Sequence, residues 1–244
     1  MTRRRLARVA ASLLFGAAAA GAVAAPFEDT MAQRVLACTG CHGPEGRAAP
    51  DGYYPRIAGK PAGYLYNQLL NFRDGRRSYA LMTNLLAPLD DAYLREIAGH
   101  FAGLDLPYPA SIPVTLAPAD AAAAARLVGD GDPARGLPAC NACHGAAMTG
   151  TAPFVPGLLG LSRDYLNAQL GAWRNGQRRA IEPDCMAKIA RLLAPDEIGA
   201  VSAWLAAQPV PAHARAASDV AGALPIACGG LAPPTANATG GGGR

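Results

Sequence analysis

The strongest constraint on this chain is a five-residue motif that occurs twice. CTGCH spans Cys38 to His42, and CNACH spans Cys140 to His144, 102 residues later. Each copy places two thiols and an imidazole close together, so the fold has to provide for the same chemistry at two places. A repeat of this kind predicts two similar structural units.

The similarity between the two halves extends well beyond these motifs. PRIAGKPAGYLYNQLLNFRDGRR begins at Pro55 and PGLLGLSRDYLNAQLGAWRNGQRR begins at Pro156, and many of their residues coincide at an offset of 101. Neither half contains a convincing alternating strand. Both halves close with apolar residues at helical spacing, namely Leu94, Ile97 and Phe101 in the first and Ile198, Val201 and Leu205 in the second. The sequence therefore predicts an all-α fold with two small tandem domains.

The two ends of the chain and a proline-rich stretch set the domain boundaries. Residues 1–24 are typical of a cleaved signal peptide, because four arginines precede an apolar run and a small-residue cleavage site. We expect an N-terminal domain over 25–106, a Pro-rich linker over 107–117 and a C-terminal domain over 118–208. The composition of 209–244, rich in Pro, Ala and Gly, predicts a mostly disordered tail.

Export changes the charge of the chain. Loss of the four leader arginines reduces the 22 basic residues to 18, which equals the 18 acidic residues. The formal charge of +4 therefore belongs to the leader and gives no ground for nucleic-acid binding. No later segment is apolar enough to span a membrane, so we expect a periplasmic protein that associates with membranes only through its partners.

Three chemistries use the spacing C-x-x-C. A thioredoxin-like redox motif needs a βαβ unit, which the pattern lacks, and a zinc site needs four ligands at tetrahedral spacing. Covalent haem attachment uses both thiols and also requires the adjacent histidine, which binds the iron as an axial ligand. The motifs thus predict two haem c groups, attached at Cys38, Cys41, Cys140 and Cys143, with His42 and His144 as axial ligands of the two irons.

A haem bound by one histidine leaves its opposite face for a second axial ligand. Met82 lies 40 residues after His42, and Met186 lies 42 residues after His144, each shortly before the last helix of its half. This matched position predicts that the two methionines complete the axial pairs. Met148 has no counterpart in the first half, so we assign it to the hydrophobic core.

Together these features resemble a known family, the dihaem class I cytochromes c, most closely the cytochrome c4 type. The resemblance covers Cys38 to about Leu205 and includes both haem motifs, both late methionines and the closing helices. It implies two tandem class I cytochrome c domains with covalently attached haem, in which the carbonyls of Pro55 and Pro156 bind the histidine rings. It also implies four residues around the haem groups, with the arginines near the propionates: Tyr64, Arg73, Tyr165 and Arg174.

A haem whose two axial positions are filled by protein can do little except accept and release one electron. We therefore expect an electron carrier rather than an enzyme, which takes electrons from a quinol oxidoreductase or a dehydrogenase and passes them to a terminal oxidase or another acceptor. A dedicated cytochrome subunit of one dehydrogenase would use the same chemistry. The alternative is a dihaem enzyme, either a peroxidase or a thiosulfate-oxidising cytochrome, in which one iron is open or carries an exchangeable ligand.

Cys185 bears directly on this alternative, because it stands beside Met186. A Cys185 thiolate on the second iron would make Met186 a core residue and would favour sulfur chemistry. Cys185 can instead pair with Cys228, the remaining cysteine outside the haem motifs, and an oxidising compartment favours such a disulfide. The disulfide would tie the tail across the loop that carries Met186.

Overall fold

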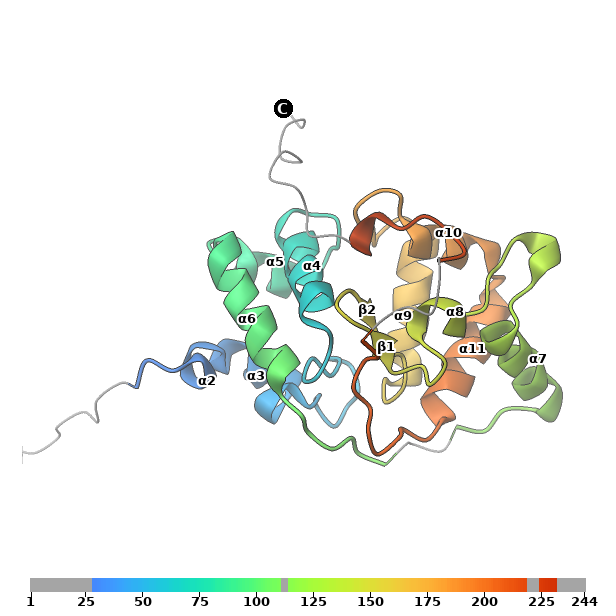
Figure 1. Cartoon of the computed structure of the whole chain (residues 1–244), viewed down its shortest axis with the longest axis horizontal. Helices are drawn as coiled ribbons and strands as arrows, with labels where there is room; N and C mark the ends of the chain where they lie inside the picture. The colour runs from blue at the N-terminus through green and yellow to red at the C-terminus, as the bar shows by residue number, and fades with distance from the viewer. Residues whose placement is uncertain (1–27, 111–113, 219–223, 232–244) are drawn as a thin grey trace, which may run out of the picture.

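Two helical domains lie side by side, with the connector between them along one edge of the molecule (Figure 1). The computed structural model describes residues 28–110, 114–218 and 224–231, so the predicted signal peptide lies outside the described residues. No helix within these ranges is long and apolar enough to cross a membrane.

Short helices make up most of the described residues. The first domain consists of α2 (Met31–Arg34), α3 (Leu36–His42), the 3-10 turn η2 (Pro44–Gly46), α4 (Ala62–Arg73), α5 (Ala80–Leu86) and α6 (Asp91–Gly103). The second domain consists of α7 (Pro118–Gly129), η3 (Pro133–Arg135), α8 (Asn141–His144), β1 (Gly150–Thr151), β2 (Val155–Pro156), α9 (Arg163–Arg174), α10 (Cys185–Leu192) and α11 (Pro195–Ala207). The turn η4 (Gly229–Leu231) follows near the end of the chain.

The core of the first domain forms where α4 packs against α6. Leu65 and Leu70 of α4 belong to one buried cluster with Leu94, Ile97 and Phe101 of α6. The three residues of α6 are those that the helical spacing predicts, because positions i, i+3 and i+7 share one face of a helix.

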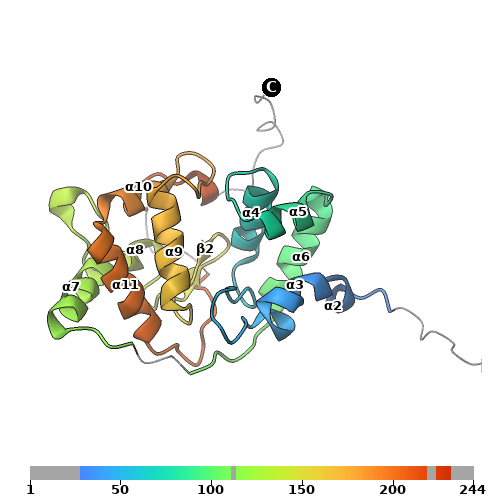
Figure 2. The same ribbon diagram turned by 180° about the vertical axis from the view of Figure 1, so that it is seen from behind.

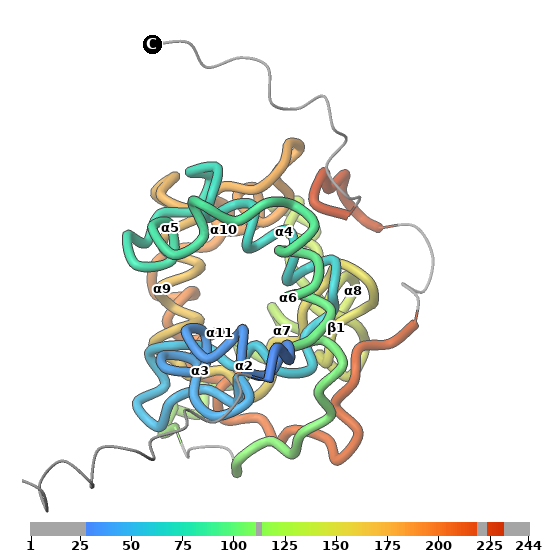
Figure 3. Tube along the Cα trace, turned by 90° about the vertical axis from the view of Figure 1, so that its left-hand side faces the viewer, coloured from blue at the N-terminus to red at the C-terminus, as the bar shows by residue number. Residues whose placement is uncertain are grey.

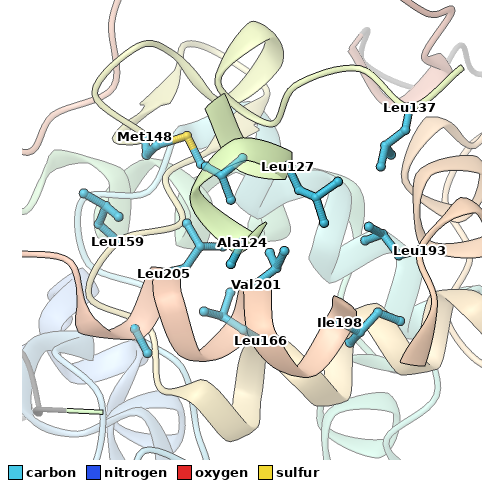
Figure 4. Close-up of a cluster of buried hydrophobic side chains, with 12 residues drawn as sticks. Ala124, Leu127, Leu137, Met148, Leu159, Leu166, Leu193, Ile198, Val201 and Leu205 are labelled. Carbon is cyan, nitrogen blue, oxygen red and sulfur yellow. The ribbon is translucent and has the colours of Figure 1, made fainter. Parts of the chain in front are cut away.

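The core of the second domain is built by α7, α9 and α11 (Figure 4). Leu127 of α7, Leu166 of α9 and both Val201 and Leu205 of α11 lie in this cluster. Met148, from the loop after the second motif, is buried in the same cluster, as the sequence predicts. Met148 is therefore a residue of the hydrophobic core.

The equivalent helices α4 and α9 approach the domain boundary from opposite sides (Figure 2). The backbone N–H of Tyr64, in the first turn of α4, donates to the Pro153 carbonyl at 3.1 Å. The hydroxyl of Ser162, which precedes α9, donates to the Gly52 carbonyl at 2.6 Å. Because Gly52 and Pro153 are equivalent in the repeat, each helix start contacts the same loop of the other domain.

Arg56 holds the beginning of the connector. Its guanidinium donates to the carbonyls of Leu106 at 2.6 Å and Pro107 at 3.2 Å, and it lies over the Tyr108 ring at 3.9 Å from the ring centroid. These contacts fix the chain where it leaves the first domain.

Parts of the C-terminal tail differ from the expectation of disorder over 209–244. The stretches 209–218 and 224–231 lie along one side of the two domains (Figure 3). Ala217 pairs with β1, since its N–H donates to the Gly150 carbonyl at 3.0 Å, and Cys228 forms a disulfide with Cys185. Composition alone does not reveal these contacts, because both depend on a partner far away in the sequence.

Candidate functional site

The first motif lies at the end of α3, where His42 turns into the body of the domain. The ring is buried, and its Nδ1 lies 2.8 Å from the Pro55 carbonyl oxygen. A carbonyl can only accept, so Nδ1 carries the proton and the Nε2 lone pair is left free. Burial lowers the pKa of His42, which keeps the ring neutral, as iron ligation requires.

The second motif repeats this arrangement on α8. His144 is buried, and its Nδ1 lies 2.7 Å from the Pro156 carbonyl oxygen. Burial lowers the pKa of His144 as well. The hydroxyl of Thr151 donates to the Cys143 carbonyl at 3.1 Å and closes the loop after the motif. Both prolines thus lie where the resemblance to class I cytochromes c implies.

Three of the four motif thiols have a pKa shifted in the wrong direction for redox exchange. Burial raises the pKa of Cys38 and of Cys143, and it raises the pKa of Cys140 to about 11. A redox-active C-x-x-C pair needs a lowered pKa, because the thiolate is the nucleophile. The raised pKa values therefore oppose the thioredoxin-like alternative and are compatible with thiols that serve as attachment points.

The two late methionines lie on short helices that line the same cavity as the histidines. Met82 is on α5 and Met186 is on α10, and both side chains are half-buried. The cavity has a volume of about 670 Å³, its lining is mostly apolar, and it includes His42, His144 and both methionines. The axial role of the methionines stays a prediction.

The cavity wall fits haem in four respects. Its apolar lining suits the flat body of the macrocycle, and the four motif cysteines are free in the structure and contribute to the cavity or its rim. The Trp173 Nε1 is buried without a hydrogen-bond partner among the described residues, so the wall holds a donor for an added acceptor. Two buried arginines, Arg77 and Arg178, also line it, and they can offset the acidic groups that haem carries.

Those two arginines form a symmetrical network between the domains. Arg77 donates to the Gln169 side-chain oxygen at 2.7 Å and to the Tyr165 hydroxyl at 3.0 Å. Arg178 donates to the side-chain oxygens of Gln169 at 2.7 Å and Gln68 at 2.8 Å. None of the described carboxylates forms an ion pair with either guanidinium, so two positive charges are buried with neutral partners only.

Arg73 and Arg174 are not among the residues that line the cavity, which differs from the expectation that they lie around the haem groups. Arg73 donates to the Leu89 carbonyl at 3.1 Å, and Arg174 donates to the equivalent Leu193 carbonyl at 2.6 Å. Each arginine ends its helix and ties it to the start of the closing helix, so its charge is used within its own domain.

Tyr64 and Tyr165 do line the cavity, as expected. Arg77, Arg178 and Lys60 also line the cavity, a position that was not predicted for them from the sequence. The repeat contained a usable signal for the first two, because Arg77 and Arg178 coincide at the offset of 101 that also aligns Gln68 with Gln169.

Cys185 and Cys228 form a disulfide, with their Cα atoms 4.9 Å apart. Cys185 begins α10 directly before Met186, so the bridge attaches the tail to the methionine helix. Beyond the bridge, the Gly230 carbonyl accepts a hydrogen bond at 2.9 Å from the Asn67 side chain of α4. The tail thus contacts both domains, and a sulfur in a disulfide is not a thiolate ligand.

Comparisons with known proteins agree with this geometry. No family model matches the chain. A thiosulfate dehydrogenase electron acceptor from Thiomonas intermedia is 38% identical over 210 residues, which cover 85% of this chain and 92% of the relative. Cytochrome c4 from Pseudomonas aeruginosa is 33% identical over 175 residues, which cover 70% of this chain and 84% of the relative.

A solved structure shows the same fold. Reduced recombinant cytochrome c4 from Pseudomonas stutzeri matches with a TM-score of 0.61 at 29% identity, over 71% of this chain and 94% of that one. The predictions of an all-α fold with two class I cytochrome c domains, and of an electron-transfer function, are confirmed. The chain belongs to the dihaem cytochrome c4 family and carries two covalently bound haem c groups.

Proposed function

We propose that this protein is a periplasmic electron carrier that accepts electrons from a thiosulfate dehydrogenase and passes them singly to a terminal oxidase or another acceptor. One observation supports the carrier function most directly. In each domain a buried histidine and a methionine at the matched position line the same cavity, so both axial positions of each iron have a protein ligand available.

We assign the covalent bonds to Cys38, Cys41, Cys140 and Cys143, and the axial pairs to His42 with Met82 and His144 with Met186. When bound, each haem supplies a one-electron redox centre of raised potential. The chain's own residues keep each histidine in one tautomer, exclude water with an apolar lining, and place Arg77 and Arg178 where they can hold acidic groups.

The donor is indicated by the relative from Thiomonas intermedia, which is named for accepting electrons from thiosulfate dehydrogenase. Two thiosulfate anions lose two electrons in total when they join through a new sulfur–sulfur bond as tetrathionate, and no proton is released. A chain with two one-electron sites can hold both electrons of one such turnover, which suits it to this donor.

Exposed apolar side chains indicate where the donor docks. Tyr53 and Leu81 are each 61% exposed and Leu85 is 38% exposed, and all three line the mouth of the cavity in the first domain. The sequence of α5, ALMTNLL, contains no charge. We therefore expect a donor whose own cofactor edge has an apolar rim, since uncharged surfaces are buried best against one another.

The periplasmic location rests on two features. The first 24 residues are typical of a signal peptide, and the Cys185–Cys228 disulfide is stable in an oxidising compartment. The disulfide also removes one support for the enzyme alternative, because Cys185 in a disulfide is not a thiolate ligand of the second iron.

The test is reduction of the purified holoprotein, followed by the absorbance of reduced haem c. We expect thiosulfate alone to leave the protein oxidised, and thiosulfate with catalytic amounts of a purified thiosulfate dehydrogenase to reduce both haem groups. Rapid reduction by thiosulfate alone would instead show an enzyme. No reduction in either mixture, with full reduction by ascorbate, would reject thiosulfate dehydrogenase as the donor.

A further inference from the structure

Lys60 is a buried charge that the proposed function does not use. It lies in the loop before α4 of the first domain, and only 4% of its surface is exposed. Its Nζ donates to the Gly157 carbonyl of the second domain at 2.8 Å. Among the described residues no carboxylate forms an ion pair with it. An ammonium group with one neutral partner is costly to bury, so its position needs a reason.

The repeat shows that the fold itself does not require this charge. At the offset of 101, the residue equivalent to Lys60 is Leu161. The residue equivalent to Gly157 is Arg56, and no described side chain of the second domain donates to the Arg56 carbonyl. The second domain therefore provides no equivalent cation for the corresponding loop of the first.

The carbonyl that Lys60 binds belongs to the residue directly after Pro156, which orients His144 in the second domain. Gly157 follows Pro156, whose carbonyl accepts from His144 Nδ1 at 2.7 Å. Lys60 and His144 also line the same cavity. Burial first, and the positive charge of Lys60 in addition, lower the pKa of His144, so the ammonium is within electrostatic reach of the ring.

We propose that Lys60 is a positioning residue through which the first domain acts on the second haem, by holding the Gly157 carbonyl and placing a positive charge beside the His144 loop. This inference rests on the assignment of His144 as an axial ligand. A nearby cation favours the state with the added electron, because reduction lowers the positive charge of the iron site. Lys60 thus raises the reduction potential of the second haem and leaves the first unaffected.

The effect of pH follows from the groups that face Lys60. These are Arg56 from its own loop and His144 from α8. Burial, and then repulsion by Arg56, lower the pKa of Lys60 from 10.5 to about 7. The ammonium is therefore present below this pH and is lost above it, so the potential of the second haem falls as the pH rises through the neutral range.

Redox titration of the holoprotein with optical detection, at a series of pH values, tests this proposal. Lys60→Leu introduces the residue that the second domain has at the equivalent position. In this variant we expect a lower potential for the second haem, which no longer changes near neutral pH. The potential of the first haem should stay the same. The control is Arg126→Leu, which removes an exposed charge from α7 and should leave both transitions unchanged. The transition that moves in Met186→His identifies the second haem.

Lys60→Gln covers the case in which the leucine variant does not fold, because it retains a donor for the Gly157 carbonyl without the charge. A lowered potential with normal thermal unfolding in the glutamine variant supports the electrostatic role. Unchanged potential and pH profile in a folded variant overturn the proposal. The titration uses an electrode and mediators, so its result is independent of whether thiosulfate dehydrogenase is the donor.

Discussion

The two domains share the residues proposed to bind haem but differ in what covers them. Tyr53, Leu81 and Leu85 are exposed in the first domain. Their counterparts in the second domain, Phe154, Cys185 and Ile189, are half-buried. Two copies of a duplicated unit can thus differ in exposure while they keep the same motifs, because contacts from outside the unit decide which face stays open.

Two devices cover the second domain. The tail is bonded to Cys185, the counterpart of the exposed Leu81. The Phe154 ring packs against Gly63 of α4, where a Cβ atom would lie 2.4 Å from the ring. Only glycine allows this approach, and the equivalent position in the second domain is Asp164. We infer that the first domain receives the donor while the second is covered by the protein itself.

The largest effect is expected from removing the attachment cysteines of one domain at a time. The double variant Cys140→Ala/Cys143→Ala should lose one haem, since the thioether bonds to the second haem can no longer form. The variant Cys38→Ala/Cys41→Ala should lose the other. Intact mass of the exported protein measures this directly, and a variant that still carries two haem groups would contradict the assignment.

The axial methionines test whether the two irons are equivalent. Met82→Ala and Met186→Ala should each abolish the sulfur-to-iron charge-transfer band of one haem. Each should also lower that haem's potential by a sizeable part of the ~0.8 V that axial ligands span. Redox titration and near-infrared spectra of the ferric protein report both quantities. An unchanged second haem in Met186→Ala would mean that a different residue is its ligand.

Removal of the disulfide tests whether the tail stabilises the second domain more than the first. Cys228→Ser should destabilise the second domain by roughly 4 kcal/mol, the chain-entropy value for a loop of this length, because residues 185 and 228 are 43 positions apart. Thermal unfolding followed at the second haem should shift, while the first should not. Thiol alkylation of the denatured, unreduced wild type provides the check, since two free thiols would show that the bridge does not form.

The smallest effect concerns the exposed face of the first domain. Leu81→Asp places a charge in an apolar contact and should slow reduction by thiosulfate dehydrogenase about tenfold, which corresponds to ~1.4 kcal/mol. Ala122→Asp, on an exposed position of α7, is the matched control and should leave the rate unchanged. Ascorbate should reduce all three proteins equally. Equal slowing in both variants would point to a general effect of charge.

Sequence alone determined the chemistry of this protein. The motifs, the late methionines and the helix faces of Leu94 and Ile198 are local patterns, in which spacing along the chain dictates position. The prolines that accept from His42 and His144 were implied by the resemblance to class I cytochromes c, and they follow the histidines within 13 and 12 residues. Short-range features of this kind can be predicted because helix geometry and chain connectivity leave few alternatives.

Only the tertiary structure decided which arginines line the cavity and which bind carbonyls within their own domain. Gly75 and Gly176, both at φ 73°, turn the chain back after α4 and α9. The later arginines Arg77 and Arg178 therefore reach the domain boundary, whereas Arg73 stays on its own domain. Lys60, the disulfide and the tail likewise depend on groups distant in sequence. No local pattern encodes how two domains lie against each other, so the asymmetry between the two haem sites arises only when they pack.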